Sequence, residues 1–273
     1  MDNTDIKKKS IFKILLTTVA AILLLLLAAT TVYTLITFSN PYWAKHSLQE
    51  YADEYNDVYI ELKNDGTIVL SPKKEKIKGA IVFYQGAAVQ RSAYIPVMAR
   101  VCKEGYACCI PEFPWNCAVL ETDAADRYIG IDGIENWFVA GHSLGGSAAS
   151  IYAEKNPEKT DGLILLSSYV LKEPGIPVLL IYGDKDGLLN MKKALGEKGS
   201  ETDSSDSEKH CIEGGNHAQM GDYGPQRGDQ EATISMQEQW DEAAEIMIEW
   251  LNRKCENKNR NEIIIEGEHP EIL

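Results

Sequence analysis

The sequence predicts one α/β domain, with a mostly parallel central sheet and helices on both of its faces. Short apolar runs that are typical of buried strands recur along the chain, and several of them end in Gly-rich loops. One of these runs passes through a tight Gly turn into a stretch of helical composition. About 230 residues follow the N-terminal segment, which is enough for a single domain with a full core.

Eight segments predict the strands of this sheet. The first two, residues 57–62 and 67–70, flank the strong hairpin turn Asn64-Asp65-Gly66 and form an antiparallel start. The other predicted strands are residues 80–84, 106–110, 137–140, 161–167, 176–182 and 209–212. Acidic, Ser-rich residues 197–208 precede the last strand and predict a solvated surface insertion.

Three helices are predicted around the strands. Residues 92–103 place Ile95, Met98, Ala99 and Cys102 on one face. A second helix covers residues 147–155, before Asn156-Pro157. The closing helix covers residues 233–253, and its buried stripe is Trp240, Ala244, Met247 and Trp250. We expect the domain to span residues 57–253 and residues 254–273 to form a polar, frayed tail.

The stretch Gly141-His142-Ser143-Leu144-Gly145-Gly146 matches the pattern G-x-S-x-G. Its flanks are a predicted strand and a predicted helix, which is the context of a nucleophile elbow. The glycines suit a sharp turn that leaves no room for Cβ atoms beside the serine. The alternative is a Gly-rich turn with a capping serine. The strand–turn–helix context favours Ser143 as a nucleophile.

A nucleophilic serine needs a base and an acid that orients the base. Strand 176–182 is followed by a loop that contains Asp184 and Asp186. Strand 209–212 is followed by a Gly-rich loop that contains His217. Catalytic groups collect at this carboxyl edge in parallel sheets. Asp186 is favoured over Asp184, because it lies further from the strand end and can reach back to the histidine. His217 is favoured over His210, which falls within a strand.

Negative charge on a substrate carbonyl oxygen needs backbone N–H donors. One predicted donor is the amide of Leu144, which follows the nucleophile. The second is expected from the loop after strand 80–84, and there we predict the amide of Ala87, with Gly86 giving the backbone room to turn.

These motifs resemble the α/β-hydrolase superfamily, most closely a lidless bacterial branch related to dienelactone hydrolases and small carboxylesterases. The matching stretches are residues 82–89, 105–120, 139–149, 161–168, 177–189 and 213–233. The resemblance implies an α/β-hydrolase fold and an acid from a G-x-x-D loop, here Gly183 to Asp186. The dienelactone type uses a cysteine nucleophile, so Ser143 implies ordinary ester hydrolysis instead. Residues 217–226 resemble a stretch characteristic of the branch.

Many lipases of this superfamily insert a cap between two strands that only residues 168–175 join here. We therefore expect no cap domain and an open site. The formal charge of the chain is −14, and residues 40–273 carry −16, with 23 basic and 39 acidic residues. This balance argues against nucleic acid or an anionic membrane surface as a partner of the domain. The six cysteines lack zinc-like spacing and are expected to be small buried thiols, although an external domain would permit a disulfide.

The N-terminus predicts a membrane anchor. Residues 11–38 are apolar except for Lys13 and small hydroxyl residues, and residues 14–37 alone are long enough to span a bilayer. Residues 1–10, which include Lys7, Lys8 and Lys9, precede this run and are expected to form a basic cytoplasmic N-terminus. Residues 39–56 are expected to be a linker. A retained signal anchor is favoured, with cleavage near Ala28-Ala29-Thr30 as the alternative. The lysine asymmetry predicts a cell-membrane protein with its domain outside.

Together these features predict a membrane-anchored serine hydrolase that cleaves an ester or similar acyl bond through Ser143, Asp186 and His217. We expect no cofactor and no metal, a small acyl substrate, and no nucleic acid. Acyl transfer to an acceptor other than water is one alternative, since it passes through the same acyl-enzyme. A hydrolase fold that has lost its chemistry and serves only for binding is another, and the intact triad residues count against it.

Overall fold

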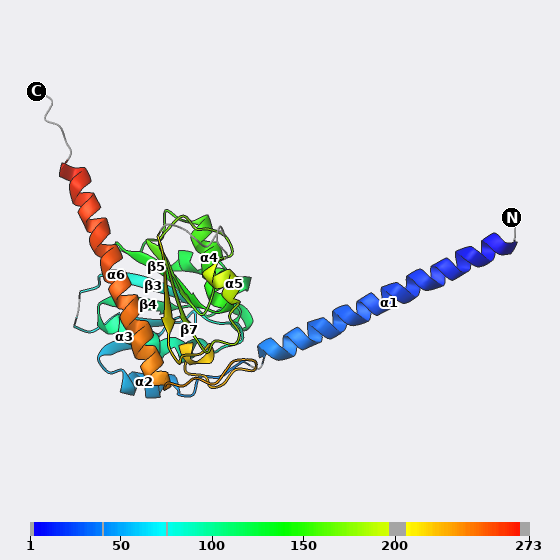
Figure 1. The fold of residues 1–273 in the computed structure, drawn as a ribbon, viewed down its shortest axis with the longest axis horizontal. Coiled ribbons are helices and arrows are strands. Elements are labelled where there is room, and N and C mark those ends of the chain that lie inside the picture. Colours follow the sequence, from blue (N-terminus) through cyan, green and yellow to red (C-terminus); the bar gives the residue numbers. More distant parts are fainter. Residues whose placement is uncertain (1–2, 40, 75, 197–205, 268–273) are drawn as a thin grey trace, which may run out of the picture. The chain divides into compact units, whose positions relative to one another are not determined.

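The structure, a computed structural model, describes residues 3–39, 41–74, 76–196 and 206–267 (Figure 1). The side chains of residues 3–11, 33–39 and 259–267 lie outside this description. The chain divides into two compact units, Met1–Pro41 and Tyr42–Leu273.

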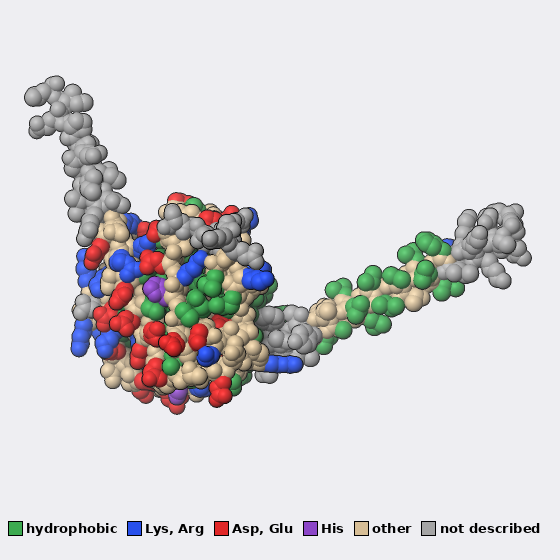
Figure 2. Space-filling view, in the orientation of Figure 1, with side chains coloured by type: hydrophobic (Ala, Val, Ile, Leu, Met, Phe, Trp, Pro, Cys, Tyr) green, Lys and Arg blue, Asp and Glu red, His purple; other side chains and the backbone are tan. Residues whose placement is uncertain are grey.

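The first unit is one helix, α1 (Asn3–Ser39). Its segment Phe12–Val32 has a mean hydropathy of 2.5, and none of it is buried. Apolar side chains line the described part of this helix (Figure 2). Four threonine hydroxyls in it donate to carbonyls three or four residues earlier, which satisfies them without water. Among the described residues, this is the only helix long and apolar enough to cross a membrane.

The second unit is built on one eight-stranded sheet with the order β1-β2-β4-β3-β5-β6-β7-β8. The strands are β1 (Val58–Leu62), β2 (Ile68–Pro72), β3 (Gly79–Tyr84), β4 (Tyr106–Ile110), β5 (Trp137–His142), β6 (Gly162–Leu166), β7 (Val178–Gly183) and β8 (Ser207–Ile212). The first two pairings are antiparallel and all others are parallel. Leu62 pairs with Ile68 across the predicted hairpin turn. The predicted mostly parallel sheet is confirmed.

Helices cover both faces of this sheet, as predicted (Figure 1). The helices of the second unit are α2 (Leu48–Glu54), α3 (Ile95–Lys103), α4 (Leu144–Lys155), α5 (Met191–Leu195) and α6 (Met236–Gly267). Side chains of α3 and α6 share one buried apolar cluster with one face of the sheet, and side chains of α4 and α5 share a second cluster with the other face. The apolar faces predicted for α3 and α6 are buried throughout.

Two segments differ from the sequence prediction. Helix α6 runs on to Gly267, so the predicted tail is helical over residues 254–267. The reason is that no Gly or Pro interrupts this stretch before Gly267. The predicted linker is also structured, because the second compact unit begins at Tyr42 and includes α2, whose Tyr51 is fully buried. Most of the predicted insertion, residues 197–205, lies outside the described residues.

The strand order creates a switch point at β3. This strand lies between β4 and β5, and the chain leaves β3 through α3 on one face and leaves β5 through α4 on the other face. In such sheets the loops diverge at the switch point, and ligands bind in the crevice between them. The loop after β3 and the turn after β5 are the two segments that carry Ala87 and Ser143.

Candidate active site

Five described residues other than glycine adopt a left-handed backbone, and all five follow parallel strands. They are Ala88 after β3, Trp115 and Asn116 after β4, Ser143 after β5 and Ser167 after β6, with φ between 49° and 55°. Such conformations cost of order 1–3 kcal/mol each and persist where surrounding structure imposes them, often at functional sites. The strain is therefore concentrated at the carboxyl edge of the sheet.

Ser143 occupies the turn between β5 and α4, with φ 53° and ψ −128°. The glycines around it are required by close approach. A Cβ on Gly145 would lie 2.1 Å from the carbonyl oxygen of Gln85, and a Cβ on Gly141 would lie 2.6 Å from the amide of Gly146. The turn is held by the Ser143 N–H, which donates to Leu166 O at 3.0 Å. These contacts place the serine on a sharp, strained turn, as a nucleophile elbow requires.

Asp186 and His217 are brought together by the loops after β7 and β8. His217 Nδ1 lies 2.9 Å from Asp186 Oδ2 and 3.1 Å from Oδ1. Both residues are buried, with exposures of 7% for Asp186 and 2% for His217. The Asp186 carboxylate also accepts the N–H groups of Leu188 and Leu189 at 2.9 and 2.8 Å. Its orientation is thus set by the backbone of its own loop.

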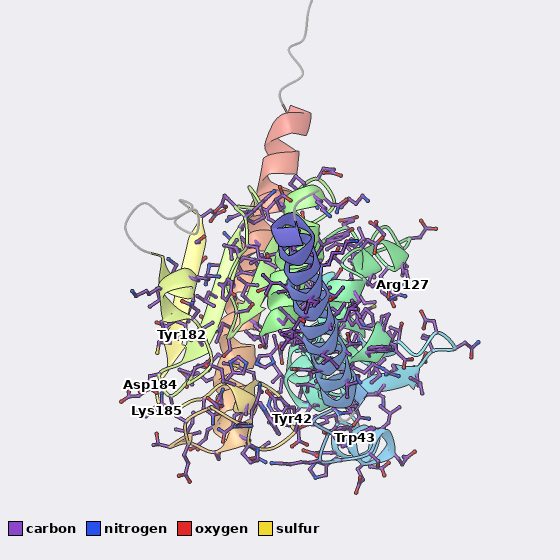
Figure 3. The ribbon with its side chains drawn as sticks, turned by 90° about the vertical axis from the view of Figure 1, so that its right-hand side faces the viewer. Tyr42, Trp43, Arg127, Tyr182, Asp184 and Lys185 are labelled. Carbon is purple, nitrogen blue, oxygen red and sulfur yellow. The ribbon has the colours of Figure 1, made fainter. Side chains whose placement is uncertain are left out.

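The structure separates the two candidate acids. Asp184 accepts the Gly214 N–H at 2.6 Å and pairs with Lys185 at 2.9 Å, and it makes no contact with His217. Figure 3 shows Asp184 and Lys185 at the periphery of the unit. Of the two aspartates, Asp186 is the one in contact with the histidine.

The pKa of Asp186 lies below its usual value. Burial is the largest single influence and works in the opposite direction, because it penalises the charged carboxylate. The hydrogen bond and the electrostatic interaction with His217, together with the two backbone N–H donors, outweigh it. The carboxylate is therefore ionised at neutral pH and can stabilise a protonated imidazole.

His217 lies beside the elbow with one ring nitrogen free. Its ring centroid is 4.5 Å from that of His142, the residue directly before Ser143. His217 Nε2 is buried and has no hydrogen-bond partner among the described residues. The Ser143 hydroxyl likewise makes no hydrogen bond to a described residue. Such catalytic contacts are often long without substrate and tighten when it binds.

Two backbone amides are available for a developing oxyanion. Leu144 is the first residue of α4, where N–H groups have no partner within the helix. The amide of Ala87 makes no hydrogen bond within the described part of the chain, whereas the neighbouring Ala88 N–H donates to Asn116 O at 2.9 Å. The structure thus leaves free the two donors that the sequence predicts.

Asn116 braces the loop after β3, and the sequence analysis missed it. Besides accepting the Ala88 N–H through its carbonyl, it accepts Gln85 Nε2 through Oδ1 at 2.9 Å. Gln85 is fully buried and also donates to Val89 O at 2.9 Å. No local pattern could have identified this brace, because it joins segments 31 residues apart.

His142 and Tyr94 link the elbow to the same loop. The Tyr94 hydroxyl lies 2.8 Å from His142 Nδ1 and accepts the Gly86 N–H at 3.0 Å. Burial, with a smaller contribution from His217, lowers the pKa of His142 well below its usual value. His142 is therefore neutral, and its ring packs beside the ring of His217.

The stretch after His217 has a structural explanation that the sequence could not supply. Asp222 is buried and accepts the Tyr51 hydroxyl at 2.7 Å, while its N–H donates to Ala93 O at 2.7 Å. Asp229 accepts the Ala218 N–H at 2.8 Å through one oxygen and the Gly187 N–H at 2.9 Å through the other. Gly187 follows Asp186 and Ala218 follows His217. Asp229 therefore joins the loop of Asp186 to the loop of His217 through two backbone hydrogen bonds.

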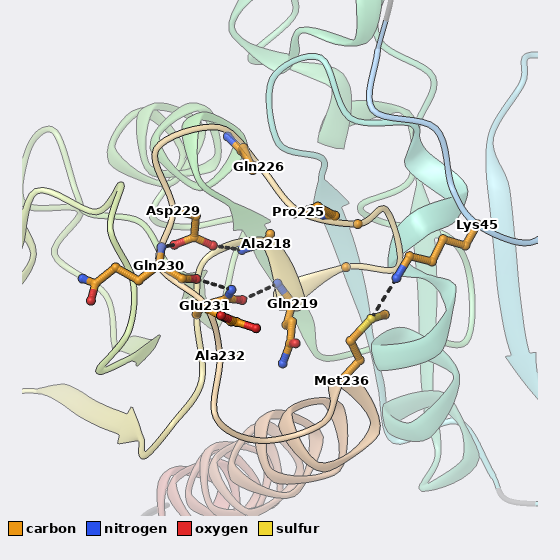
Figure 4. Close-up of a pocket in the computed structure, with 13 residues that line it drawn as sticks. Lys45, Ala218, Gln219, Pro225, Gln226, Asp229, Gln230, Glu231, Ala232 and Met236 are labelled. Carbon is orange, nitrogen blue, oxygen red and sulfur yellow. Dashed lines mark hydrogen bonds between the residues drawn. The ribbon is translucent and has the colours of Figure 1, made fainter.

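A cavity of about 450 Å³ borders the segment that follows β8, residues 216–236 (Figure 4). Its lining includes Asn216 and Ala218 on either side of His217, together with Lys45 and Met236. Ser143 does not line it. Figure 4 shows the Asp229 carboxylate bound to backbone in its wall, so this carboxylate is already used for support.

The connection between β6 and β7 contains no helix, as expected from its length. The six cysteines are free thiols, and all but Cys211 are buried.

Comparisons with known proteins agree with this architecture. Residues 80–241, more than half of the chain, match the alpha/beta hydrolase family. A predicted CIB-like hydrolase from Thermoplasma acidophilum superposes with a TM-score of 0.51 at 17% identity, covering 72% of this chain and 98% of its own. MGS-MChE2, an alpha/beta hydrolase from the metagenome of sediments of the Mar Chica lagoon in Morocco, gives 0.50 at 18% identity, with coverage of 72% and 99%. No curated protein matches the sequence.

Proposed function

The chain belongs to the alpha/beta hydrolase family, and on this premise we propose that it is a membrane-anchored serine hydrolase that cleaves an ester or similar acyl bond. The observation that carries the proposal is the buried Asp186–His217 pair beside the strained Ser143 elbow, where no described residue is a hydrogen-bond partner of His217 Nε2. The family and the solved structures support a hydrolase; the serine nucleophile, the ester substrate and the anchor are our own inference.

The mechanism follows from the hydrogen bonds. Because Asp186 accepts the Nδ1 proton of His217, the lone pair of Nε2 is free to accept the Ser143 hydroxyl proton. The Ser143 oxygen then bonds to the acyl carbon, and the carbonyl oxygen takes up negative charge between the Leu144 and Ala87 amides. His217 returns the proton to the leaving alcohol. Water attacks the acyl-enzyme in the same way and releases the acid.

The direct test is labelling with a fluorophosphonate probe, followed by a panel of p-nitrophenyl esters. Labelling of the folded protein at Ser143, together with ester turnover, is the expected result. Folded protein that never labels would remove the serine hydrolase proposal.

Short-chain soluble esters should be hydrolysed without activation by a lipid interface. The reason is the short connection between β6 and β7, which supplies no lid that an interface would have to open. The measurement is rate against concentration for p-nitrophenyl butyrate through its solubility limit. A sharp rise above that limit would contradict the open site.

We also propose a single-pass topology with the second unit outside the cell membrane. Lys7, Lys8 and Lys9 precede the apolar run, and Lys45 is the only basic residue in the dozen or so positions after it. Basic residues are retained on the cytoplasmic side. Protease added to intact spheroplasts should remove a C-terminal tag. A tag that survives until the membrane is broken would place the active site in the cytoplasm.

A further inference from the structure

We propose that the site acts on esters resident in the same membrane, namely neutral or zwitterionic esters with a long apolar acyl chain. The proposal rests on the proposed function, both the hydrolase activity and the anchor, and adds its substrate class. It comes from the segment that follows the apolar helix, residues 42–46, which we call the strap. The strap is built into the rim of the candidate active site.

The strap pairs with the loop that carries the predicted oxyanion donor. The Tyr42 N–H donates to Ala88 O at 2.7 Å, and the Gln90 N–H donates to Tyr42 O at 2.9 Å. Tyr42 and Val89 form a parallel β-bridge, and the Ala44 N–H donates to Gln90 Oε1 at 2.9 Å. These partners begin one residue after Ala87, so the strap forms an edge of the site.

The strap also binds the loop of the predicted base. The Lys45 N–H donates to Asp222 O at 2.9 Å, and His46 Nδ1 lies 2.7 Å from Asp222 Oδ2. The hydrogen bond to Asp222 raises the pKa of His46. Asp222 is 1% exposed, so releasing the strap would remove a partner from a buried carboxylate. The strap is therefore a fixed bridge between two loops of the site.

The covalent chain limits how far the strap can be from the last residue of α1. Tyr42 is three positions after Ser39, the last residue of α1. A peptide extends at most about 3.6 Å per residue, so the two Cα atoms lie within roughly 11 Å of each other for any arrangement of the two units. A domain of this size has a radius of gyration of about 17 Å. The length of chain that links Tyr42 to the last residue of α1 is thus shorter than the width of the domain.

Exposed apolar side chains surround the site. Four segments that follow strands of the sheet, together with the strap, each carry at least one large exposed apolar residue; five of these residues, one from each segment, have exposures between 37% and 61%. These residues are Trp43, Trp115, Leu144, Leu171 and Leu188. Single exposed apolar residues are ordinary, but their recurrence on successive loops around a site makes a rim suited to a lipid surface. Figure 3 shows Trp43 toward the same end of the unit as Asp184.

The charge of the domain selects among membrane esters. Residues 40–273 carry −16, and in the face shown in Figure 2 acidic and basic side chains are intermixed without a basic patch. Such a domain does not attract an anionic headgroup. The covalent link to α1, and not charge attraction, keeps the domain near the membrane. We therefore infer neutral or zwitterionic headgroups and recognition through the acyl chain.

The test places the full-length protein in vesicles of ether-linked phosphocholine lipid, which contain no ester of their own. Two probes are compared: 4-methylumbelliferyl oleate in the bilayer and p-nitrophenyl butyrate in solution. A flexible 20-residue Gly/Ser insert directly after Ser39 should lower the oleate rate on the order of tenfold, because effective concentration falls as a tether lengthens. The butyrate rate should stay within about twofold. The control carries the same 20 residues after Leu273.

A second pair of variants tests the rim without touching the tether. Trp43→Gln should lower the oleate rate several-fold relative to Ile131→Gln. Ile131 is a matched control, because it is 50% exposed and lies in the connection that leads into the amino end of β5. If the insert also reduces fluorophosphonate labelling, the comparison of Trp43→Gln with Ile131→Gln becomes the deciding test of the membrane substrate, because these variants leave the strap backbone in place.

The outcomes separate the substrate class from the function beneath it. Equal oleate rates for the wild type, the insert and Trp43→Gln would overturn the membrane substrate and leave the hydrolase intact. Undiminished hydrolysis of both probes by Ser143→Ala would instead overturn the proposed function. Release of the protein by alkaline carbonate would overturn the anchor. A parallel arm with anionic ether lipid should give a lower oleate rate, and a higher one would contradict the headgroup assignment.

Discussion

Replacing Ser143 with alanine should abolish fluorophosphonate labelling and lower esterase turnover by on the order of 10⁴ or more, because the members of a triad act as a unit. The change removes only the hydroxyl. The backbone of the turn is held by the Ser143 N–H bond to Leu166 O and by the Ser168 hydroxyl, which donates to Ser143 O at 2.6 Å. Folding should therefore be preserved while the nucleophile is lost.

Ser147→Ala is the matched control for this experiment. Ser147 lies one helical turn further along α4 and is buried, with its hydroxyl 3.4 Å from that of Ser168 and 3.3 Å from Tyr169 O. Its loss should cost about 1 kcal/mol of stability and leave labelling near the wild-type level. Equal labelling of the Ser143→Ala protein would show that the probe reacts elsewhere and that the elbow is not the nucleophile.

The strands and the local part of the site could be predicted because their signals are local. An apolar run followed by a Gly-rich turn marks the carboxyl end of a buried strand, and Ser143, Asp186 and His217 each follow such a run. Spacing from the strand end also favoured Asp186 over Asp184, and in the structure it is Asp186 that contacts the histidine.

The supporting contacts could not be predicted, because they join distant segments. Asn116 braces Gln85 across 31 residues, Asp229 holds Gly187 across 42, and Asp222 binds His46 across 176. Each is a polar residue outside the strands and α-helices, where sequence patterns favour a solvated surface. The strap was expected to be a linker for the same reason, since its order comes from Ala88, Gln90 and Asp222 rather than from its own composition.

Asp186→Asn should lower turnover by about 10⁴ through the wrong tautomer of His217. Asp186 Oδ1 accepts the Leu188 and Leu189 N–H groups, so the single oxygen of an asparagine would stay there to satisfy them. Its NH₂ group would then point at His217 Nδ1 and donate to it. The histidine proton would move to Nε2, where it blocks acceptance of the serine proton. Substrate binding should change little, so the loss should appear in kcat.

Asp184→Asn is the control that the same loop provides. Asp184 is partly exposed and bound to Gly214 and Lys185, so its replacement should change turnover by no more than about threefold, as expected for a surface pair. Thermal unfolding of both variants checks that they are folded, and kcat and KM for p-nitrophenyl butyrate give the comparison. A larger loss in the Asp184 variant would move the acid to Asp184 and would require the Asp186–His217 contact to be structural.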